Sequence, residues 1–255
     1  MDKKLNIAIS VAAIALALLV WQAAPGRVID RFFLPTPVEI LRGLWEMLVD
    51  GTLVLSITAS LYRILAGWLL GSAVAVPIGL LVGTFRPMKS AFDPFVHFFR
   101  FIPAISFVTL FIVWFGIGEA SKVLLVAYAT GFIVLVNTAS GIGSISADKI
   151  DAARCLGASR QQVFFRVILP ASLPNIYVGM RLGLSSSFLV IVAAEMLAAE
   201  SGLGYLLWNS RLYFRIDWMF GAIVVLGLLG FLTDRLMRFL GRSLMQRYLR
   251  QALKY

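Results

Sequence analysis

Six apolar segments, each close to the length of a membrane span, constrain the fold of this chain more than any other feature of its sequence. An α-helix needs about 20 apolar residues to cross the roughly 30 Å hydrocarbon core of a bilayer. Stretches of this length indicate membrane spans rather than the core of a soluble domain. We therefore expect an all-α membrane protein whose six helices cover about residues 5–23, 61–82, 95–115, 123–142, 176–198 and 218–240.

The first apolar segment could instead belong to a cleaved signal peptide, because Lys3 and Lys4 precede it. However, Gln22-Ala23-Ala24 is a poor small-x-small cleavage site, and the apolar run is long for a signal peptide. We expect the segment to be retained, so that residues 1–255 form a single transmembrane domain.

The composition agrees with a bilayer as the main solvent, since 60% of the residues are hydrophobic and only 14% are charged. The net charge of +10 could suggest a nucleic-acid partner, but the basic residues concentrate at the ends of the apolar segments. This distribution argues against nucleic-acid binding. Cys155 is the single cysteine of the chain, which excludes an internal disulfide.

The basic residues also predict the orientation of the chain. With the N-terminus inside, the inner segments hold fourteen of the 23 Lys and Arg residues and the outer segments hold six. Cytoplasmic loops of membrane proteins carry such an excess of positive charge. Both termini, and the polar segment 146–170, are therefore expected in the cytoplasm.

Small residues recur every four positions along the second apolar segment, a spacing that lets another helix approach closely in lipid. A shorter stripe follows in the fifth segment. Pro77 and Pro103 lie inside apolar segments, where they favour kinks. The two stripes consist of Gly67, Gly71, Ala75, Gly79 and Gly83, and of Gly179, Gly183 and Ser187.

The polar segment 146–170 reads as two short helices joined at residues 157–159. Ser146 is placed to cap the first helix, and Gly157 is suited to end it in a left-handed conformation. Ser159 and Gln162 form a capping box that starts the second helix, which we expect Pro170 to end. A charged segment of this kind lies in water, where it either contacts a soluble partner or packs under its own helix bundle, and the residues alone favour neither.

The pattern of this segment closely resembles the cytoplasmic "EAA" loop of ABC importer permeases, with Asp where the family usually has Glu. The resemblance is carried by Asp151-Ala152-Ala153, Gly157, Phe164, Ile168, Pro170 and Pro174. It implies that this loop is the part of a membrane subunit that a separate ATPase grips. The residues implied in ATPase coupling are Asp151, Ala152, Ala153, Gly157, Ala158, Arg160, Phe164, Leu169 and Pro170.

Further motifs resemble the nitrate/sulfonate/taurine/bicarbonate branch of these permeases. They include Arg100-x-Ile102-Pro103, residues 114–122, Gly179-x-Arg181-x-Gly183 and Ala194-Glu195-Met196. The segment 104–108 departs from the sequence expected after Pro103, so no particular solute is carried over.

The resemblance implies the six-helix transmembrane domain of a type I ABC importer, with cytoplasmic coupling helices, in a bacterial plasma (inner) membrane. It also implies the partners: ATP-binding cassette ATPase subunits, an extracytoplasmic substrate-binding protein and a second permease copy, expected to form a homodimer. The chain would carry a small, anionic solute by ATP-driven alternating access. ATP and Mg would bind to the partner ATPase, and we expect no cofactor or metal on this chain.

Arg63, Arg100, Arg181 and Glu195 lie in or near apolar segments, where charged side chains usually face a cavity or a partner. Three arginines against one deep carboxylate suggest positive potential in a pathway for an anion. We take these four residues as the candidate pathway set and expect at least one arginine to line it, with Arg181 as the first choice. Arg63 and Arg100 could instead lie shallow enough to extend their charges to the membrane interface. The structural alternative is an ion pair between Glu195 and one of the arginines.

A secondary transporter or channel, acting without an ATPase, remains the alternative function. It would explain six helices but not the capped polar segment, and the two halves of the chain show no convincing repeat. A membrane enzyme would need a convergent set of acid, base or metal-binding groups, which one histidine and one deep glutamate do not supply. The chain also lacks a Gly-rich phosphate loop ending in Lys-Ser/Thr, so we do not expect it to hydrolyse ATP.

Overall fold

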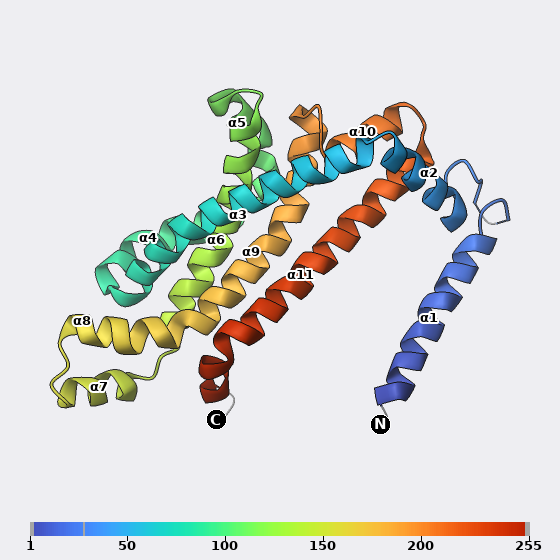
Figure 1. Ribbon diagram of the computed structural model, residues 1–255. Helices are drawn as coiled ribbons and strands as arrows, with labels where there is room; N and C mark the ends of the chain where they lie inside the picture. The colour runs from blue at the N-terminus through green and yellow to red at the C-terminus, as the bar shows by residue number, and fades with distance from the viewer. Residues whose placement is uncertain (1–2, 28, 253–255) are drawn as a thin grey trace.

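The computed structural model describes residues 3–27 and 29–252, and helices form nearly all of this part of the chain (Figure 1). The helices are α1 Lys3–Ala23, α2 Pro37–Val49, α3 Thr52–Thr84, α4 Arg86–Phe99, α5 Val108–Phe115, α6 Glu119–Gly143, α7 Ala147–Cys155, α8 Arg160–Val163, α9 Leu169–Ala198, α10 Leu203–Leu212 and α11 Ile216–Ala252. A 3₁₀ turn, η1, covers Ala104–Phe107, and a π-helical turn, η2, covers Phe164–Ile168.

Within the described residues, four helices are long and apolar enough to cross a membrane, and a bent pair gives a fifth span. The four comprise α3, α6, α11 to Ser243, and the continuous helix from Arg160 to Ala198. The first predicted span is helical as α1, but its apolar stretch, Val11–Ala23, is shorter than the four helices that could cross a membrane. The helix α10 was not predicted.

The third predicted span, 95–115, is not one helix, and this prediction was wrong. α4 ends at Phe99, and helical structure resumes only at Ala104, with its axis at 87° to that of α4. Pro103, where we expected a kink, precedes the 3₁₀ turn. Proline disfavours helical backbone in the residue before it, which agrees with a full break rather than a bend.

The second predicted span begins nine residues earlier than expected, at Thr52 rather than 61. Its first turns contain Ser56 and Ser60, whose polarity masked the helix in the sequence. Both side chains are buried, and they face other helices rather than lipid.

The centre of the molecule is the contact of α3 with α6, and of α6 with α9 (Figure 1). The stripe of small residues on α3 makes this contact close. A Cβ atom added to Gly67 would lie 2.6 Å from Val126, and one added to Gly79 would lie 2.7 Å from Thr138. Close backbone approach through glycine is the packing mode expected of helices in lipid.

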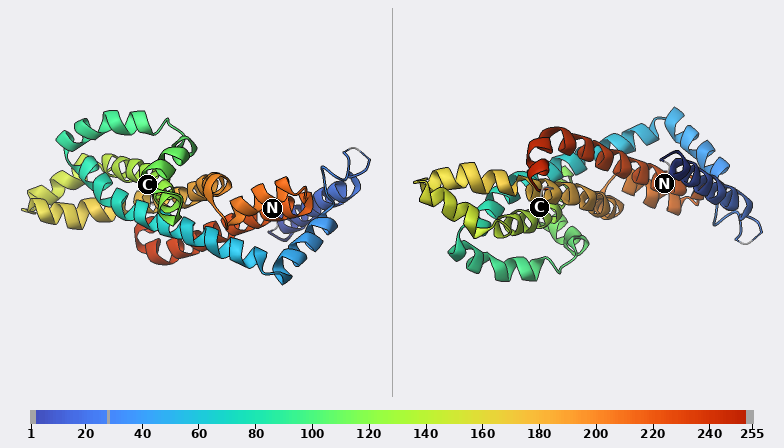
Figure 2. Two further views of the ribbon diagram at one scale, coloured as in Figure 1. Left: turned by 90° about the horizontal axis from the view of Figure 1, so that it is seen from above. Right: turned by 90° about the horizontal axis from the view of Figure 1, so that it is seen from below.

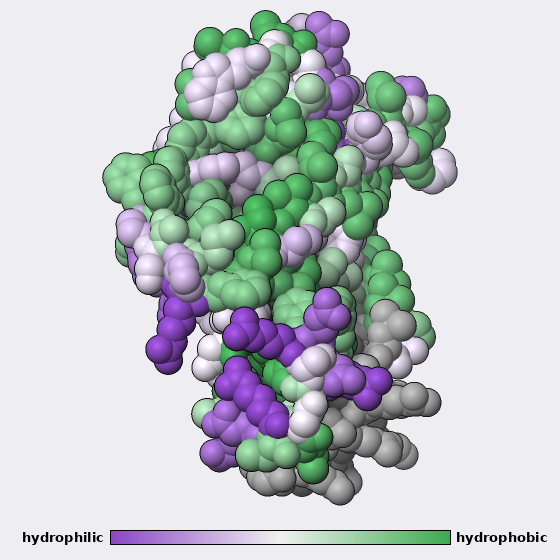
Figure 3. Space-filling view, turned by 90° about the vertical axis from the view of Figure 1, so that its left-hand side faces the viewer, coloured by the Kyte–Doolittle hydropathy of each residue, from purple (hydrophilic) through white to green (hydrophobic). Residues whose placement is uncertain are grey.

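The loops gather at two opposite ends of the long helices. The end with α7 and α8 also holds the first turn of α1 and the last turns of α11, whereas α2 and α10 lie at the other end (Figure 1). Views along the bundle show α1 and the α7–α8 pair at opposite sides of an elongated outline (Figure 2). Hydrophilic residues collect at the α7–α8 end, below a largely hydrophobic body (Figure 3).

The second helix of the polar segment does not end at Pro170, as the sequence had suggested. α8, η2 and α9 instead form one continuous helix of 39 residues. A proline inside an α-helix removes a hydrogen bond and clashes with the carbonyl of the preceding turn. Here the wider π turn at Phe164–Ile168 comes just before Pro170, which sits in the first turn of α9. We attribute the continuity of the helix to this widening.

Helix α2 lies at the opposite end and is fixed by its own first turn. Thr36 and Glu39 form a capping box, with Pro37 at the first helical position. The backbone N–H of Thr36 donates to the Glu39 carboxylate at 2.7 Å, and this bond lowers the pKa of Glu39 below its ordinary value.

The close contact of α3 with α6 makes a testable prediction. Gly71→Val would place its Cβ against the backbone carbonyl of Ala127 and 3.0 Å from the Ala127 Cα, so the two helices would have to separate. Overpacking of this kind costs about 1–3 kcal/mol. We expect a lower melting midpoint in detergent by fluorescence-detected size-exclusion chromatography. Gly227→Val is the matched control, because no atom lies within 4 Å of a Cβ added there. Equal midpoints for the two variants would contradict this packing.

Candidate functional site

The polar segment forms a helical hairpin that begins three residues after α6. α7 ends at Cys155, and Gly157 then adopts a left-handed φ of +80°. Ser159 caps α8 as expected, with its hydroxyl accepting from the backbone N–H of Gln162 at 3.3 Å. Ser146 occupies the capping position of α7, but its side chain makes no capping bond. The chain turns from α7 into α8 at Gly157.

The residues that the resemblance implied in coupling divide between two faces of this hairpin. Ala153, Ala158 and Phe164 pack inward on a small core formed by Ile142, Val163 and Ile168. Leu169 and Pro170 are partly buried in the first turn of α9. The exposed face carries Asp151, Ala152, Gly157 and Arg160.

Leu156 lies at the tip of the hairpin with 89% of its surface exposed, and the sequence analysis did not single it out. Asp151 and Arg154 pair at 3.4 Å beside it, also in solvent. Behind the tip, a groove of about 570 Å³ runs between the hairpin and the end of α3, lined by Arg154, Arg160 and Phe165 among others. An exposed leucine next to a hollow lined by two arginines is a surface that a protein partner can grip.

At the opposite end of the long helices, Arg63 on α3 is buried and makes five hydrogen bonds. Its guanidinium donates to Glu195 at 2.7 Å, to both oxygens of Glu119 at 2.7 Å, and to the carbonyl and hydroxyl of Ser201 at 2.6 and 3.2 Å. Every N–H of the guanidinium is thereby used. Arg63 thus links α3 to α6, α9 and the loop before α10, and has no donor left for a solute in this conformation.

Glu195 is fully buried, and its remaining hydrogen bonds come from Ser60 on α3 and from the first turn of α10. The Ser60 hydroxyl lies 2.8 and 2.9 Å from its two oxygens, and the backbone N–H of Gly204 donates at 2.9 Å. A Cβ at Gly202, whose φ is +116°, would collide with this carboxylate. The structural alternative of the sequence analysis, an ion pair between Glu195 and an arginine, is the arrangement found here.

Arg181, the first choice for the anion pathway, pairs with Asp234 rather than with Glu195, so it is not the arginine of the structural alternative. Its guanidinium pairs with Asp234 on α11 at 2.6 Å, and Arg238 binds the other oxygen of Asp234 at 2.9 Å. Because Arg63 also has two carboxylate partners, the imbalance of three arginines against one carboxylate is not found. Partners so far apart along the chain carry no local sequence signal.

Arg100 is the remaining member of the predicted pathway set. It lies at the C-terminal end of α4, is exposed, and stacks over the Phe101 ring at 4.8 Å. No carboxylate among the described residues lies within 4.0 Å of it. Arg100 lines a pocket of about 360 Å³ between the break of the third span and helices α6 and α9.

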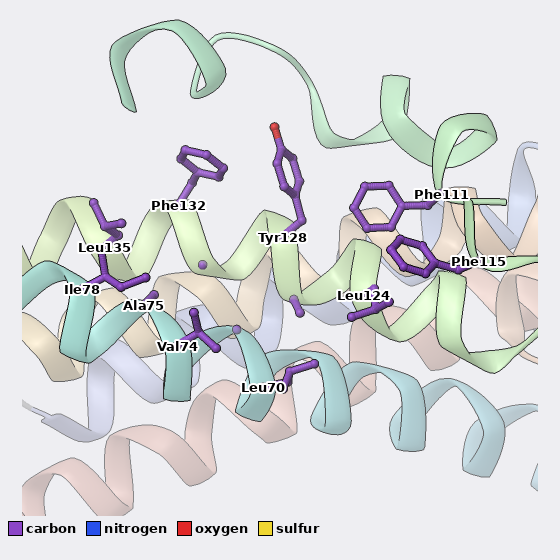
Figure 4. Close-up of a pocket in the computed structure, with 13 residues that line it drawn as sticks. Leu70, Val74, Ala75, Ile78, Phe111, Phe115, Leu124, Tyr128, Phe132 and Leu135 are labelled. Atoms are coloured by element: carbon purple, nitrogen blue, oxygen red, sulfur yellow. The ribbon is translucent and has the colours of Figure 1, made fainter. Parts of the chain in front are cut away.

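A second pocket, of about 460 Å³, shares Tyr128 and Phe132 with the first and is lined almost wholly by apolar atoms. Tyr128 and Phe132 rise from α6 toward the chain that connects α4 and α5, while Leu70 and Val74 face them from α3 (Figure 4). Since Tyr128 and Phe132 line both pockets, these two rings separate an apolar space from the space that contains Arg100.

Comparison of this chain with known proteins shows the family to which it belongs. The model of the family described as "Binding-protein-dependent transport system inner membrane component" matches residues 75–246. The chain belongs to this family. The resemblance inferred from the polar loop is therefore confirmed, and the protein is a multi-pass membrane permease of the ABC importer kind.

Relatives extend the match over most of the chain. The putative aliphatic sulfonates transport permease protein of Bacillus subtilis is 36% identical over 233 residues, covering 91% of this chain and 84% of the relative. The taurine transport system permease protein of Escherichia coli is 34% identical over 245 residues, covering 94% and 89%. Both names fall in the branch that the motifs had indicated.

Solved structures show the same fold. A chain of the MetNI methionine ABC transporter, in an inward-facing conformation, has a TM-score of 0.64 with 19% identity, covering 83% of this chain and 96% of that one. The predicted fold class, the transmembrane domain of a type I ABC importer, is thereby confirmed.

The buried cluster at Arg63 makes a prediction about stability. Glu195→Ala would leave the Arg63 guanidinium and the Ser60 hydroxyl without their buried acceptor, and breaking a buried pair in this way costs about 3–5 kcal/mol. We expect a markedly lower melting midpoint of the detergent-purified protein. Asp151→Ala removes a carboxylate from an exposed pair, worth about 0–1 kcal/mol, and serves as the control. Similar midpoints for the two variants would show that the cluster does not hold these helices together.

Proposed function

We propose that this chain is the permease subunit of an ATP-driven importer for a small anionic solute of the sulfonate, taurine, nitrate or bicarbonate kind. The observation that carries the proposal is the exposed hairpin α7–α8, with Leu156 at its tip, in a chain of this permease family. The names of the sulfonate and taurine relatives support the class of solute.

The hairpin is joined to the membrane helices in a way that suits mechanical coupling. α7 follows α6 after residues 144–146, and α8 continues into α9 without a break. A displacement of the hairpin therefore moves the ends of α6 and α9, the two helices at the centre of the bundle. In the proposed cycle, closure of the ATPase subunits on ATP shifts the paired hairpins and switches the pathway between inward-open and outward-open states.

The partners follow from the same proposal. ATP-binding cassette subunits would bind at the α7–α8 end, with ATP and Mg in the ATPase and hydrolysis there rather than in this chain. A substrate-binding protein would dock at the α2–α10 end, and a second copy of this chain would complete the pathway as a homodimer. The excess of basic residues at the α7–α8 end supports a cytoplasmic location for that end and for both termini of the chain.

Co-purification distinguishes this function from a secondary transporter or channel. The tagged chain, expressed with its native neighbours and extracted in mild detergent, should recover an ATPase in constant ratio. Uptake in proteoliposomes should then require internal ATP. Uptake by the chain alone, with no ATPase present, would establish the alternative.

The turn at Gly157 gives a sharper test of coupling. Gly157→Val introduces a β-branched residue at a φ of +80°, which such residues rarely adopt, although space is open around it. We expect membrane insertion to be unchanged while complex assembly is lost or ATP hydrolysis no longer drives uptake. Gly143→Val is the matched control, because space is equally open there and φ lies outside the left-handed range. Normal uptake and normal ATPase stimulation in Gly157→Val would rule out the hairpin as the coupling element.

A further inference from the structure

The break in the third span forms one wall of a pocket that contains polar side chains among apolar ones. The pocket of about 360 Å³ is walled by the break at residues 99–104, by α6 and by α9. Its size lies in the range of small-molecule sites. Four residues with polar side chains line it: Arg100, Tyr128, Asn137 and Ser186.

The pocket lies near the middle of the spans rather than at their ends. Tyr128 and Asn137 lie nine and eighteen residues into α6, and Ser186 lies seventeen residues into α9. Irregular backbone at such a depth is tolerated where it lines a cavity or is buried in protein. The unwound chain between Phe99 and Ala104 meets this condition, since it forms one wall of the pocket.

Arg100 gives the pocket its charge. It is the one charged residue that lines the pocket, and within the described residues it has no carboxylate partner. Arg63 and Arg181, by contrast, are both neutralised by ion pairs. An unpaired charge at this depth is costly unless it faces water or a ligand.

The other polar groups supply hydrogen-bond donors. The Tyr128 hydroxyl is buried and has no hydrogen-bond partner among the described residues. Figure 4 shows its ring pointing away from α3, toward the chain between α4 and α5. Asn137 uses one amide N–H on the Ile133 carbonyl at 2.8 Å, which leaves the second available. A guanidinium and neutral donors together suit an oxoanion, which offers only acceptors.

We propose that Arg100, Tyr128, Asn137 and Ser186 form a binding site for a small oxoanion, such as a sulfonate, inside this pocket. Its place in transport rests on the proposed function, but the binding chemistry does not. Arg100 attracts the anion, while the donors of α6 and α9 hold its oxygens. The Phe99 and Phe132 rings leave an apolar wall for the remainder of the solute.

Charge-selective thiol labelling tests the site without any transport assay. In a Cys155→Ser background, Ser186→Cys places the only thiol in the pocket. Its thiolate attacks a methanethiosulfonate reagent, a disulfide forms, and methanesulfinate leaves. We compare the ethylsulfonate reagent, an anion, with the ethyltrimethylammonium reagent, a cation, on the full chain purified in mild detergent with every subunit that co-purifies with it.

We expect Arg100→Gln to lower the ratio of anionic to cationic labelling rates at position 186 by about tenfold or more, because a nearby full charge acts oppositely on the two reagents. Arg86→Gln removes the same charge from the far end of α4 and should leave the ratio unchanged, and Arg100→Lys should retain most of it. Sodium methanesulfonate should slow labelling more than sodium chloride at equal ionic strength. Size-exclusion profiles verify that each variant is assembled.

An unchanged ratio in Arg100→Gln, or a thiol that neither reagent reaches, would overturn the site. The outcome is separable from the proposed function. Charge-selective labelling in a chain that never recovers an ATPase would keep the site and remove the importer. An ATP-dependent importer without such labelling would keep the function and remove the site.

Discussion

A guanidinium buried among membrane helices needs fixed acceptors, and the arrangement of the upper half of this protein follows from how Arg63 obtains them. Its partners come from α6, from α9 and from the loop before α10, so four parts of the chain must meet at one point. Ser60 and the first N–H groups of α10 then complete the shell around Glu195. Removing Arg63 or Glu195 would leave the other as an unpaired buried charge, which is why the cluster favours a single packing of the helices.

The cluster and the hairpin lie at opposite ends of the same two helices. Glu119 begins α6 and Glu195 lies near the end of α9, whereas the hairpin joins the other ends of both. Between them, the small residues of α3 hold α6 close along much of its length. A force on the hairpin would therefore act on α6 and α9 at one end, while the Arg63 cluster holds their other ends together. Under the proposed mechanism, the helices pivot about the Arg63 cluster rather than slide as a block.

Much of this could be predicted from the sequence because the signals are local. The lengths of the apolar segments indicated the long helices, and the small residues at every fourth position indicated the close contact that α3 makes with α6. Gly157 predicted the left-handed turn, and Ser159 with Gln162 predicted the cap that starts α8. In each case the residue acts on its own backbone or on residues within one turn. The family resemblance rested on the same loop, which explains why it was recognisable without a structure.

The failures involve partners or environments that the local sequence does not contain. Glu119 and Asp234 lie more than fifty positions from the arginines that they neutralise. Glu119 falls between two predicted spans, whereas Asp234 lies within the predicted span 218–240 and was left out of the charge count. Pro170 stops an ordinary helix, but the π turn before it changes the geometry that the proline meets. The same reasoning explains the break after Phe99. An apolar run is compatible with a straight span or with a broken one. Here the backbone N–H groups of residues 100–102 keep local hydrogen bonds, and the break borders a cavity that Arg100 also lines. Arg100, the member of the predicted pathway set that has no carboxylate partner among the described residues, therefore lies in the segment where the third span is broken.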